Sequence, residues 1–138
     1  MTEPNEPKSR IGCKVILFHR PGGRVRFGVV EAERGAEFPA ASFPGLLAID
    51  RELAAFAAES LGLGEPRIHE RFVERPDPRG ALYYLVEELS RPESPAGSAA
   101  LPVRWLHAAE VAERVGQADR KALAKAMIYL SGQPPAKA

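Results

Sequence analysis

The 138-residue sequence has little of what several protein classes require. Its single cysteine, Cys13, excludes an internal disulfide framework and any zinc site built from several cysteines. No apolar run approaches the roughly 18 residues that a membrane-spanning helix needs. Neither sign of charge dominates, because 19 lysines and arginines stand against 18 aspartates and glutamates. The composition therefore predicts no membrane association and no broad electrostatic binding to nucleic acid.

The two ends of the chain differ in composition from its middle. Residues 1–12 and 131–138 are rich in proline and in small or polar residues, and we expect both to be flexible tails. The first residues do not resemble a secretory signal, so we expect a cytoplasmic protein. Residues 13–130 have the length of one typical domain, which is long enough to bury a sizeable core.

The middle of the chain predicts short strands and helices without a regular βαβ repeat. Strands are expected over 14–18, 25–30, 67–73, 82–89 and 103–106, and helices over 51–61, 107–115 and 119–130. The stretch 31–49 contains two glycines, two prolines and no clear period, so we expect mostly loop there. This order favours an α+β fold in which helices pack on a mixed sheet.

Two of the predicted helices have a clear apolar face. Asp50 is the expected N-cap of the first one. Its apolar stripe has the spacing i, i+3, i+4 and i+8 and consists of Leu53, Phe56, Ala57 and Leu61. The apolar face of the last helix is expected at Leu123, Ala126, Met127 and Leu130. We therefore expect both helices to pack one side against the sheet.

The segment FPGLLAIDRELAAFAAESLGL, residues 43–63, resembles the signature of the Nudix family of pyrophosphohydrolases. In that family a Pro-Gly loop leads into a helix that ends in the pattern Arg, Glu, bulky, any, Glu, Glu, any, Gly, bulky. Residues 14–31 are similar to the family's opening hairpin, and residues 104–115 (RWLHAAEVAERV) to its late tryptophan strand and helix. The resemblance implies a Nudix-like α/β/α sandwich around a mixed β-sheet, and pairing into a homodimer.

The resemblance also implies a divalent-cation site on the first helix. Nudix helices carry carboxylates at i, i+3 and i+4, which places them on one face where they jointly bind Mg²⁺. Aligned on Gly62, this helix keeps Glu59. Two further glutamates and the arginine of the pattern are replaced by Ser60, Phe56 and Ala55. An alignment shifted by four residues adds Glu52, but Glu52 and Glu59 are about 10.5 Å apart along the helix, too far for one ion to contact both easily.

A further metal carboxylate of the family can come from outside the helix. Glutamates that flank the second predicted hairpin are Glu70, Glu74, Glu87 and Glu88. We take Glu52, Glu59 and Glu88 as candidate ligands of Mg²⁺ or Mn²⁺, with Glu52 and Glu59 as the catalytic candidates. The alternative is that all of these are ordinary solvated charges, off the apolar stripe of the helix or at the ends of strands.

Other polar groups give no recognisable site. His19, His69 and His107 lie on separate predicted elements, and none has metal-ligand spacing with another. The pair Gly22-Gly23 joins two strands, which indicates a hairpin turn rather than a phosphate-binding loop. Trp105 lies in a predicted strand, where core packing is the expected role.

Two functions follow from the resemblance. The loss of three helix positions favours a domain that binds a nucleotide-type ligand or a protein partner with little or no hydrolysis, because the electrostatic clamp on the transition state would be weakened. The alternative is an active Mg²⁺-dependent hydrolase that cleaves a nucleoside diphosphate linked to another moiety. A third possibility is an α+β binding module outside the Nudix family.

Overall fold

The structure is a computed structural model that describes residues 11–20, 24–33, 35–43, 49–75, 80–89 and 103–132. Its elements are β1 (Ile11–His19), β2 (Arg26–Ala32), β3 (Gly35–Glu37), β4 (Ala40–Phe43), α1 (Ile49–Glu59), β5 (Pro66–Glu74), β6 (Leu82–Glu88), β7 (Arg104–Leu106), α2 (Ala108–Arg114) and α3 (Gln117–Ser131). Within these ranges no helix is long and apolar enough to cross a bilayer.

The strands form one mixed sheet. Its order is β3-β2-β1-β6-β5, with β4 pairing with β1 and β7 pairing with β2. The central pair β1 and β6 is parallel, whereas the other pairs are antiparallel. Both predicted hairpins are confirmed, since β1 pairs with β2 and β5 pairs with β6.

The two central strands are apolar on both sides because both sides of the sheet are covered. Along β1, Val15 and Leu17 contact the core on the α1 side, and Ile16 and Phe18 contact the core on the α2 and α3 side. Successive side chains of a strand point to opposite faces, so a strand buried on both faces has a continuous apolar run. The run KVILF thus directs its residues alternately into two separate cores.

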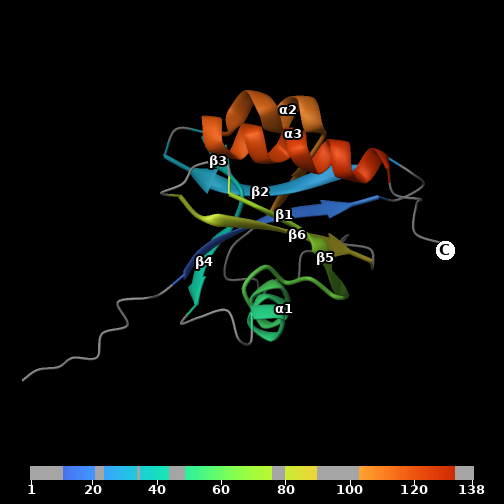
Figure 1. The fold of residues 1–138 in the computed structure, drawn as a ribbon. Helices are drawn as coiled ribbons and strands as arrows, with labels where there is room; N and C mark the ends of the chain where they lie inside the picture. Colours follow the sequence, from blue (N-terminus) through green and yellow to red (C-terminus); the bar gives the residue numbers. More distant parts are fainter. Residues whose placement is uncertain are drawn as a thin grey trace, which may run out of the picture.

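The helices cover the two faces of the sheet. Figure 1 shows α1 on one face and α2 with α3 on the other. Leu53 and Ala57 of α1 are fully buried, as are Val111 of α2 and Ala126 of α3. The predicted α+β class and the α/β/α sandwich around a mixed sheet are therefore confirmed.

The prediction of mostly loop over residues 31–49 is wrong for the described part of this range. This stretch contains β3 and β4, which have three and four residues. Ala36 of β3 pairs with Glu31 of β2, and Ser42 of β4 pairs with Gly12 of β1. Strands this short show no period of their own, and their extended form depends on the longer strands beside them.

Two details of the predicted helices also differ. Helix α1 begins at Ile49, so Asp50 lies in its first turn and is not its N-cap. The helix ends before Gly62, whose φ of 72° is the left-handed conformation that favours glycine. In α3 the predicted Met127 is 44% exposed. The buried face is turned away from it and consists of Asp119, Ala122, Leu123, Ala126 and Leu130.

The described strands and helices extend slightly beyond the predicted domain of residues 13–130. Strand β1 begins at Ile11, and α3 ends at Ser131. Of the predicted tails, residues 1–12 and 131–138, the parts 1–10 and 133–138 lie outside the described residues.

Candidate functional site

The two glutamates predicted on the first helix lie outside its packed face. Glu52 is half-buried and Glu59 is exposed, whereas Leu53 and Ala57 face the core. Among the described residues, no three His, Cys, Asp or Glu side chains lie close enough to hold a metal ion. Glu52, Glu59 and Glu88 are all described and therefore do not form such a group. Their roles as ligands or catalytic groups stay predictions.

Glu88 is buried and holds the chain that leaves α1. Its side chain is 1% exposed, and its two oxygens accept hydrogen bonds from the backbone N–H groups of Gly64 and Glu65, each at 3.1 Å. These residues connect α1 to β5. The predicted alternative of a solvated strand end is wrong for this residue, and its carboxylate has a structural role that the sequence did not indicate.

Glu87 lies next to Glu88 in β6, but its side chain faces the opposite core. Its carboxylate accepts two hydrogen bonds from Arg20, at 3.0 and 3.1 Å, and one of 3.0 Å from Nε2 of His69. Since a carboxylate only accepts, Nε2 carries the proton and Nδ1 is the acceptor for the Tyr129 hydroxyl at 3.3 Å. The result is a largely buried chain of polar groups from Arg20, just after β1, through β6 and β5 to α3.

The ionisation of this chain follows from its partners. Burial would raise the pKa of Glu87, but the hydrogen bonds from Arg20 and His69 outweigh it and the pKa is lowered. Burial lowers the pKa of His69, and the contact with Glu87 offsets only part of this. Glu87 is therefore ionised and His69 neutral near pH 7.

A second polar cluster lies where α3 begins. Asp119 is 4% exposed, and its carboxylate accepts hydrogen bonds from Lys14, from the Tyr83 hydroxyl and from the backbone N–H of Phe38. Both Asp119 oxygens are 3.0 Å from Nζ of Lys14, which also donates to Oε1 of Glu37 at 3.2 Å. The cluster joins α3 to β1, β6 and β3.

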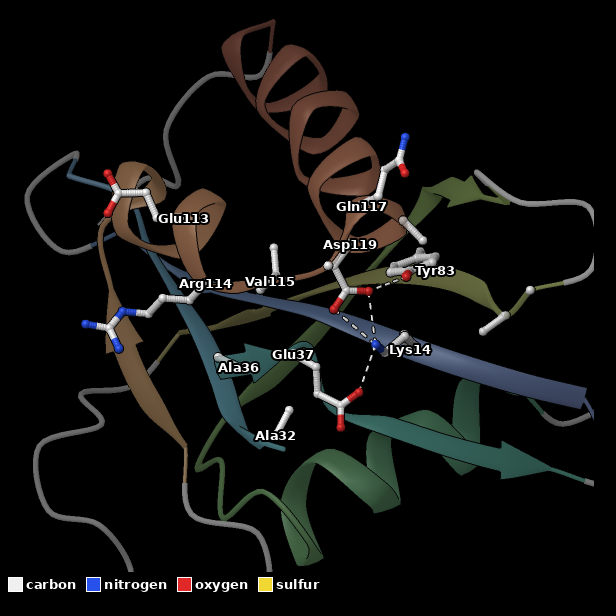
Figure 2. Close-up of a pocket in the computed structure, with 14 residues that line it drawn as sticks. Lys14, Ala32, Ala36, Glu37, Tyr83, Glu113, Arg114, Val115, Gln117 and Asp119 are labelled. Carbon is white, nitrogen blue, oxygen red and sulfur yellow. Dashed lines mark hydrogen bonds and ion pairs between the residues drawn. The ribbon is translucent and has the colours of Figure 1, made fainter. Parts of the chain in front are cut away.

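This cluster forms the floor of an open pocket of about 610 Å³. Figure 2 shows Lys14 between Asp119 and Glu37, below the turn from α2 to α3. Sequence reasoning missed the site, although a signal was present. Asp119 precedes Ala122, Leu123 and Ala126 at helical spacing, so it was a charged residue on the apolar face of its own helix.

An aromatic pair lies on the α1 side of the sheet. The rings of His19 and Trp105 are 5.9 Å apart, edge to face. Nδ1 of His19 donates to the carbonyl of Glu88 at 2.8 Å, which fixes the orientation of the ring. Trp105 is half-buried and packs against the α1 core, so it is partly a core residue, as predicted.

Solved structures similar to this one identify the fold. No family model matches the sequence, and the search of curated proteins finds no match. Ap4A hydrolase from C. elegans in a binary complex is 15% identical with a TM-score of 0.67, over 88% of this chain and 99% of that chain. The NUDIX domain of Shewanella oneidensis NrtR with ADP ribose is 12% identical with a TM-score of 0.59, over 87% of both chains.

The chain has the Nudix fold. A third similar structure is the C-terminal domain of mouse MUTYH in complex with human PCNA, which is 11% identical with a TM-score of 0.56 over 95% of both chains. At this level of identity the likeness concerns the fold alone.

The described residues do not fit the divalent-cation site that the Nudix fold implies. Such a site is built from several carboxylate oxygens around one ion. On α1, Ala55 and Phe56 have no carboxylate, and Glu59 is exposed without two further acidic or histidine ligands near it. The buried acids of β6 hold protein groups instead: Glu88 on the α1 side binds backbone N–H groups, and Glu87 on the opposite side binds Arg20.

Proposed function

We propose that this Nudix-fold domain binds a nucleotide-type ligand and hydrolyses it little or not at all. One observation carries the proposal: the described residues contain no group of three acidic or histidine side chains that could hold a metal ion. Without a cation clamp, a site of this type loses most of its stabilisation of a reacting diphosphate. The fold and its aromatic pair, His19 and Trp105, would remain for binding.

The similar structures support a nucleotide-type ligand. The NrtR NUDIX domain was crystallised with ADP ribose, and the C. elegans protein is a hydrolase of Ap4A. A protein partner is the second candidate, because the MUTYH domain forms a complex with PCNA and because Met127 and Ile128 of α3 are 44% and 72% exposed. A cytoplasmic location and pairing into a homodimer belong to the proposal as well.

The test is a parallel measurement of turnover and binding. The protein is incubated with ADP-ribose and with Ap4A, each with Mg²⁺, with Mn²⁺ and with chelator, and product release is followed. Ligand binding is followed as a rise in the unfolding temperature. We expect stabilisation by at least one nucleotide, the same with and without metal, and no turnover above that of a blank.

Matched variants decide between the two functions. Glu59→Gln removes the carboxylate that the Nudix pattern retains, and Glu110→Gln is an exposed control on α2. Metal-dependent turnover that Glu59→Gln abolishes and Glu110→Gln preserves would establish the hydrolase instead. Absence of both turnover and stabilisation would leave the protein-partner function.

A further inference from the structure

The outer side of α3 exposes apolar side chains to water. Ile128 is 72% exposed and Met127 is 44% exposed, although the opposite side of this helix is packed on the sheet. Figure 1 shows the sheet on one side of α3. Ala124, one turn before Ile128, is exposed as well. Positions i, i+3 and i+4 lie on one side of a helix, so these three residues are neighbours on the surface.

The exposed positions of α3 have the spacing with which one helix packs on another. Gln117, Lys121, Ala124 and Ile128 are all exposed and follow each other at intervals of four, three and four residues. This is the spacing of the residues that face the partner in a coiled coil. Ala124 has a small side chain, which lets a second backbone come close to the middle of the row. At 1.5 Å per residue the row spans about 16 Å, the length of about three helical turns.

This row is accompanied by positive charge alone. Arg120, Lys121 and Lys125 are exposed, whereas the single acidic residue of α3, Asp119, is buried. The guanidinium of Arg120 is fixed by two backbone carbonyls at the end of α2, at 2.9 and 3.2 Å. Lys125 is 3.7 Å from Glu74 and its side chain is 60% exposed, so this pair leaves the ammonium accessible. The outer side of α3 is therefore both basic and partly apolar.

These two properties together favour one kind of occupant. A second copy of α3 would bring the same positive charges against each other. A bilayer takes up a whole apolar helix face, which this row of Gln117, Lys121, Ala124 and Ile128 does not offer. A nucleic acid would meet the lysines through its phosphates but would give Ile128 no apolar partner. A helix with both acidic and apolar side chains meets the lysines and the apolar residues at once.

We propose that the outer side of α3 docks an acidic amphipathic helix of a partner protein. Its apolar side chains would pack on Ala124 and Ile128, and its carboxylates would pair with Lys121 and Lys125. This goes beyond the nucleotide-type ligand and specifies the chemistry of the protein partner that is the second candidate in the proposed function. The docking surface requires no metal and lies on the other face of the sheet from α1.

The first experiment identifies the occupant by NMR titration of the ¹⁵N-labelled full chain. The probe is a synthetic amphipathic peptide with leucine along one side of the helix and glutamate on both flanks. One control peptide has lysine in place of each glutamate, and the other has glutamine in place of each leucine. We expect the acidic peptide to shift the amide signals of Lys121, Ala124 and Ile128. The lysine peptide should cause no shift, and the glutamine peptide should bind about tenfold more weakly or not at all.

Two further probes test the other occupants. They are a DNA duplex and vesicles of phosphatidylcholine with phosphatidylserine, both added to the same labelled chain. We expect neither to shift the signals of Ala124 and Ile128 as far as the acidic peptide does. Shifts of α3 that are equal or larger with DNA or with vesicles would overturn the choice of a protein helix.

The second experiment removes the apolar contact alone. Ile128→Ser shortens a side chain that is 72% exposed, so the fold should be retained. We expect the affinity for the acidic peptide to fall about tenfold or more, because a few apolar side chains at the centre of an interface carry most of its binding energy. Leu89→Ser is the matched control, since Leu89 is 41% exposed and lies after β6 rather than on α3.

The third experiment reverses the charges. Lys121→Glu combined with Lys125→Glu should abolish binding of the acidic peptide and create binding of the lysine peptide. The matched control combines Arg24→Glu with Arg51→Glu, which reverses two exposed positive charges on other elements. This control should bind the acidic peptide on α3 as the unchanged chain does.

The outcomes separate this proposal from the proposed function. No shift with the acidic peptide, or shifts confined to elements other than α3, overturn the docking surface. Unchanged affinity in Ile128→Ser or in the charge reversal, with both variants folded by the same spectra, overturns it too. Stabilisation by nucleotides is measured without any peptide, so its absence would count against the nucleotide-type ligand and leave the docking surface standing.

Discussion

Buried acidic side chains have different partners on the two faces of the sheet. Two adjacent residues of β6 show this difference. Glu87 points to the α2 and α3 side, where Arg20 and His69 meet it. Glu88 points to the α1 side, where backbone N–H groups meet it. Four polar residues are buried in the described part of the chain, and His69, Glu87 and Asp119 all lie on the α2 and α3 side. The α2 and α3 face therefore combines an apolar core with buried ionic contacts, whereas the α1 face is held mainly by apolar ones.

This difference bears on how α1 is attached to the sheet. The helix is attached to the sheet through Leu53 and Ala57, both fully buried, and not through its acidic residues. Ala55 and Glu59 are exposed and take no part in that attachment, whereas Phe56 packs partly against the same core. The buried ion pairs of Asp119 with Lys14 and of Glu87 with Arg20 lie on the other side of the sheet.

The largest expected effect comes from breaking the ionic cluster of the α2 and α3 side. Asp119→Ala leaves the Lys14 ammonium with Glu37 alone and removes the acceptor of the Tyr83 hydroxyl and the Phe38 N–H. We expect the free energy of unfolding in urea to fall by about 3–5 kcal/mol. Glu113→Ala, at an exposed position of α2, is the control and should change it by less than about 0.5 kcal/mol.

A loss below about 1 kcal/mol in Asp119→Ala would contradict the contrast between the two faces. It would mean that this buried pair contributes no more than an exposed one. Lys14→Met, introduced into the Asp119→Ala variant, then distinguishes the contribution of the Lys14 charge from that of its packing. Met retains the apolar part of the lysine side chain but has no charge.

Part of this organisation was accessible from the sequence. The apolar runs of β1 and β6 and the periodicity of α1 and α3 predicted the layers, and the resemblance at residues 43–63 predicted the Nudix fold. Pairing over long separations was not accessible. Lys14 and Asp119 are 105 positions apart, and whether Glu87 ends a strand in solvent or in a core depends on where Arg20 and His69 arrive. The sequence alone does not give the distances in space between these side chains.

A smaller loss is expected on the α1 side, from Glu88→Gln. The amide retains one acceptor oxygen, so one of the two N–H groups of Gly64 and Glu65 is left without its acceptor. We expect a cost of about 1–3 kcal/mol, with faster hydrogen exchange at these two amides. Glu65→Gln, at an exposed position, is the control. Exchange that accelerates equally throughout β6 would show that Glu88 supports the whole sheet rather than this connection.

The pH dependence of stability tests whether the buried His69 on the α2 and α3 side is neutral in the folded protein. Burial lowers its pKa from the ordinary 6.5, so the unfolded chain binds more protons than the folded one in this range. The free energy of unfolding should therefore fall as the pH drops from 7 to 5. The pKa of Glu87 is lowered from 4.5, so the contribution of this carboxylate to the free energy of unfolding is lost only at lower pH. His69→Gln should flatten the slope between pH 7 and 5, whereas the exposed control His107→Gln should keep it.

The smallest effect is expected from an exposed ion pair on the α2 and α3 side of the sheet. Lys125 of α3 and Glu74 of β5 are 3.7 Å apart, and the lysine side chain is 60% exposed. Water screens such a pair, so Lys125→Ala should change the free energy of unfolding by less than about 0.5 kcal/mol, and less still in 1 M salt. Lys121→Ala is a control on the exposed side of the same helix. If Lys125→Ala instead approached the cost of Asp119→Ala, burial would not be what distinguishes the ionic contacts of this face, because both pairs join α3 to the sheet and differ chiefly in their exposure.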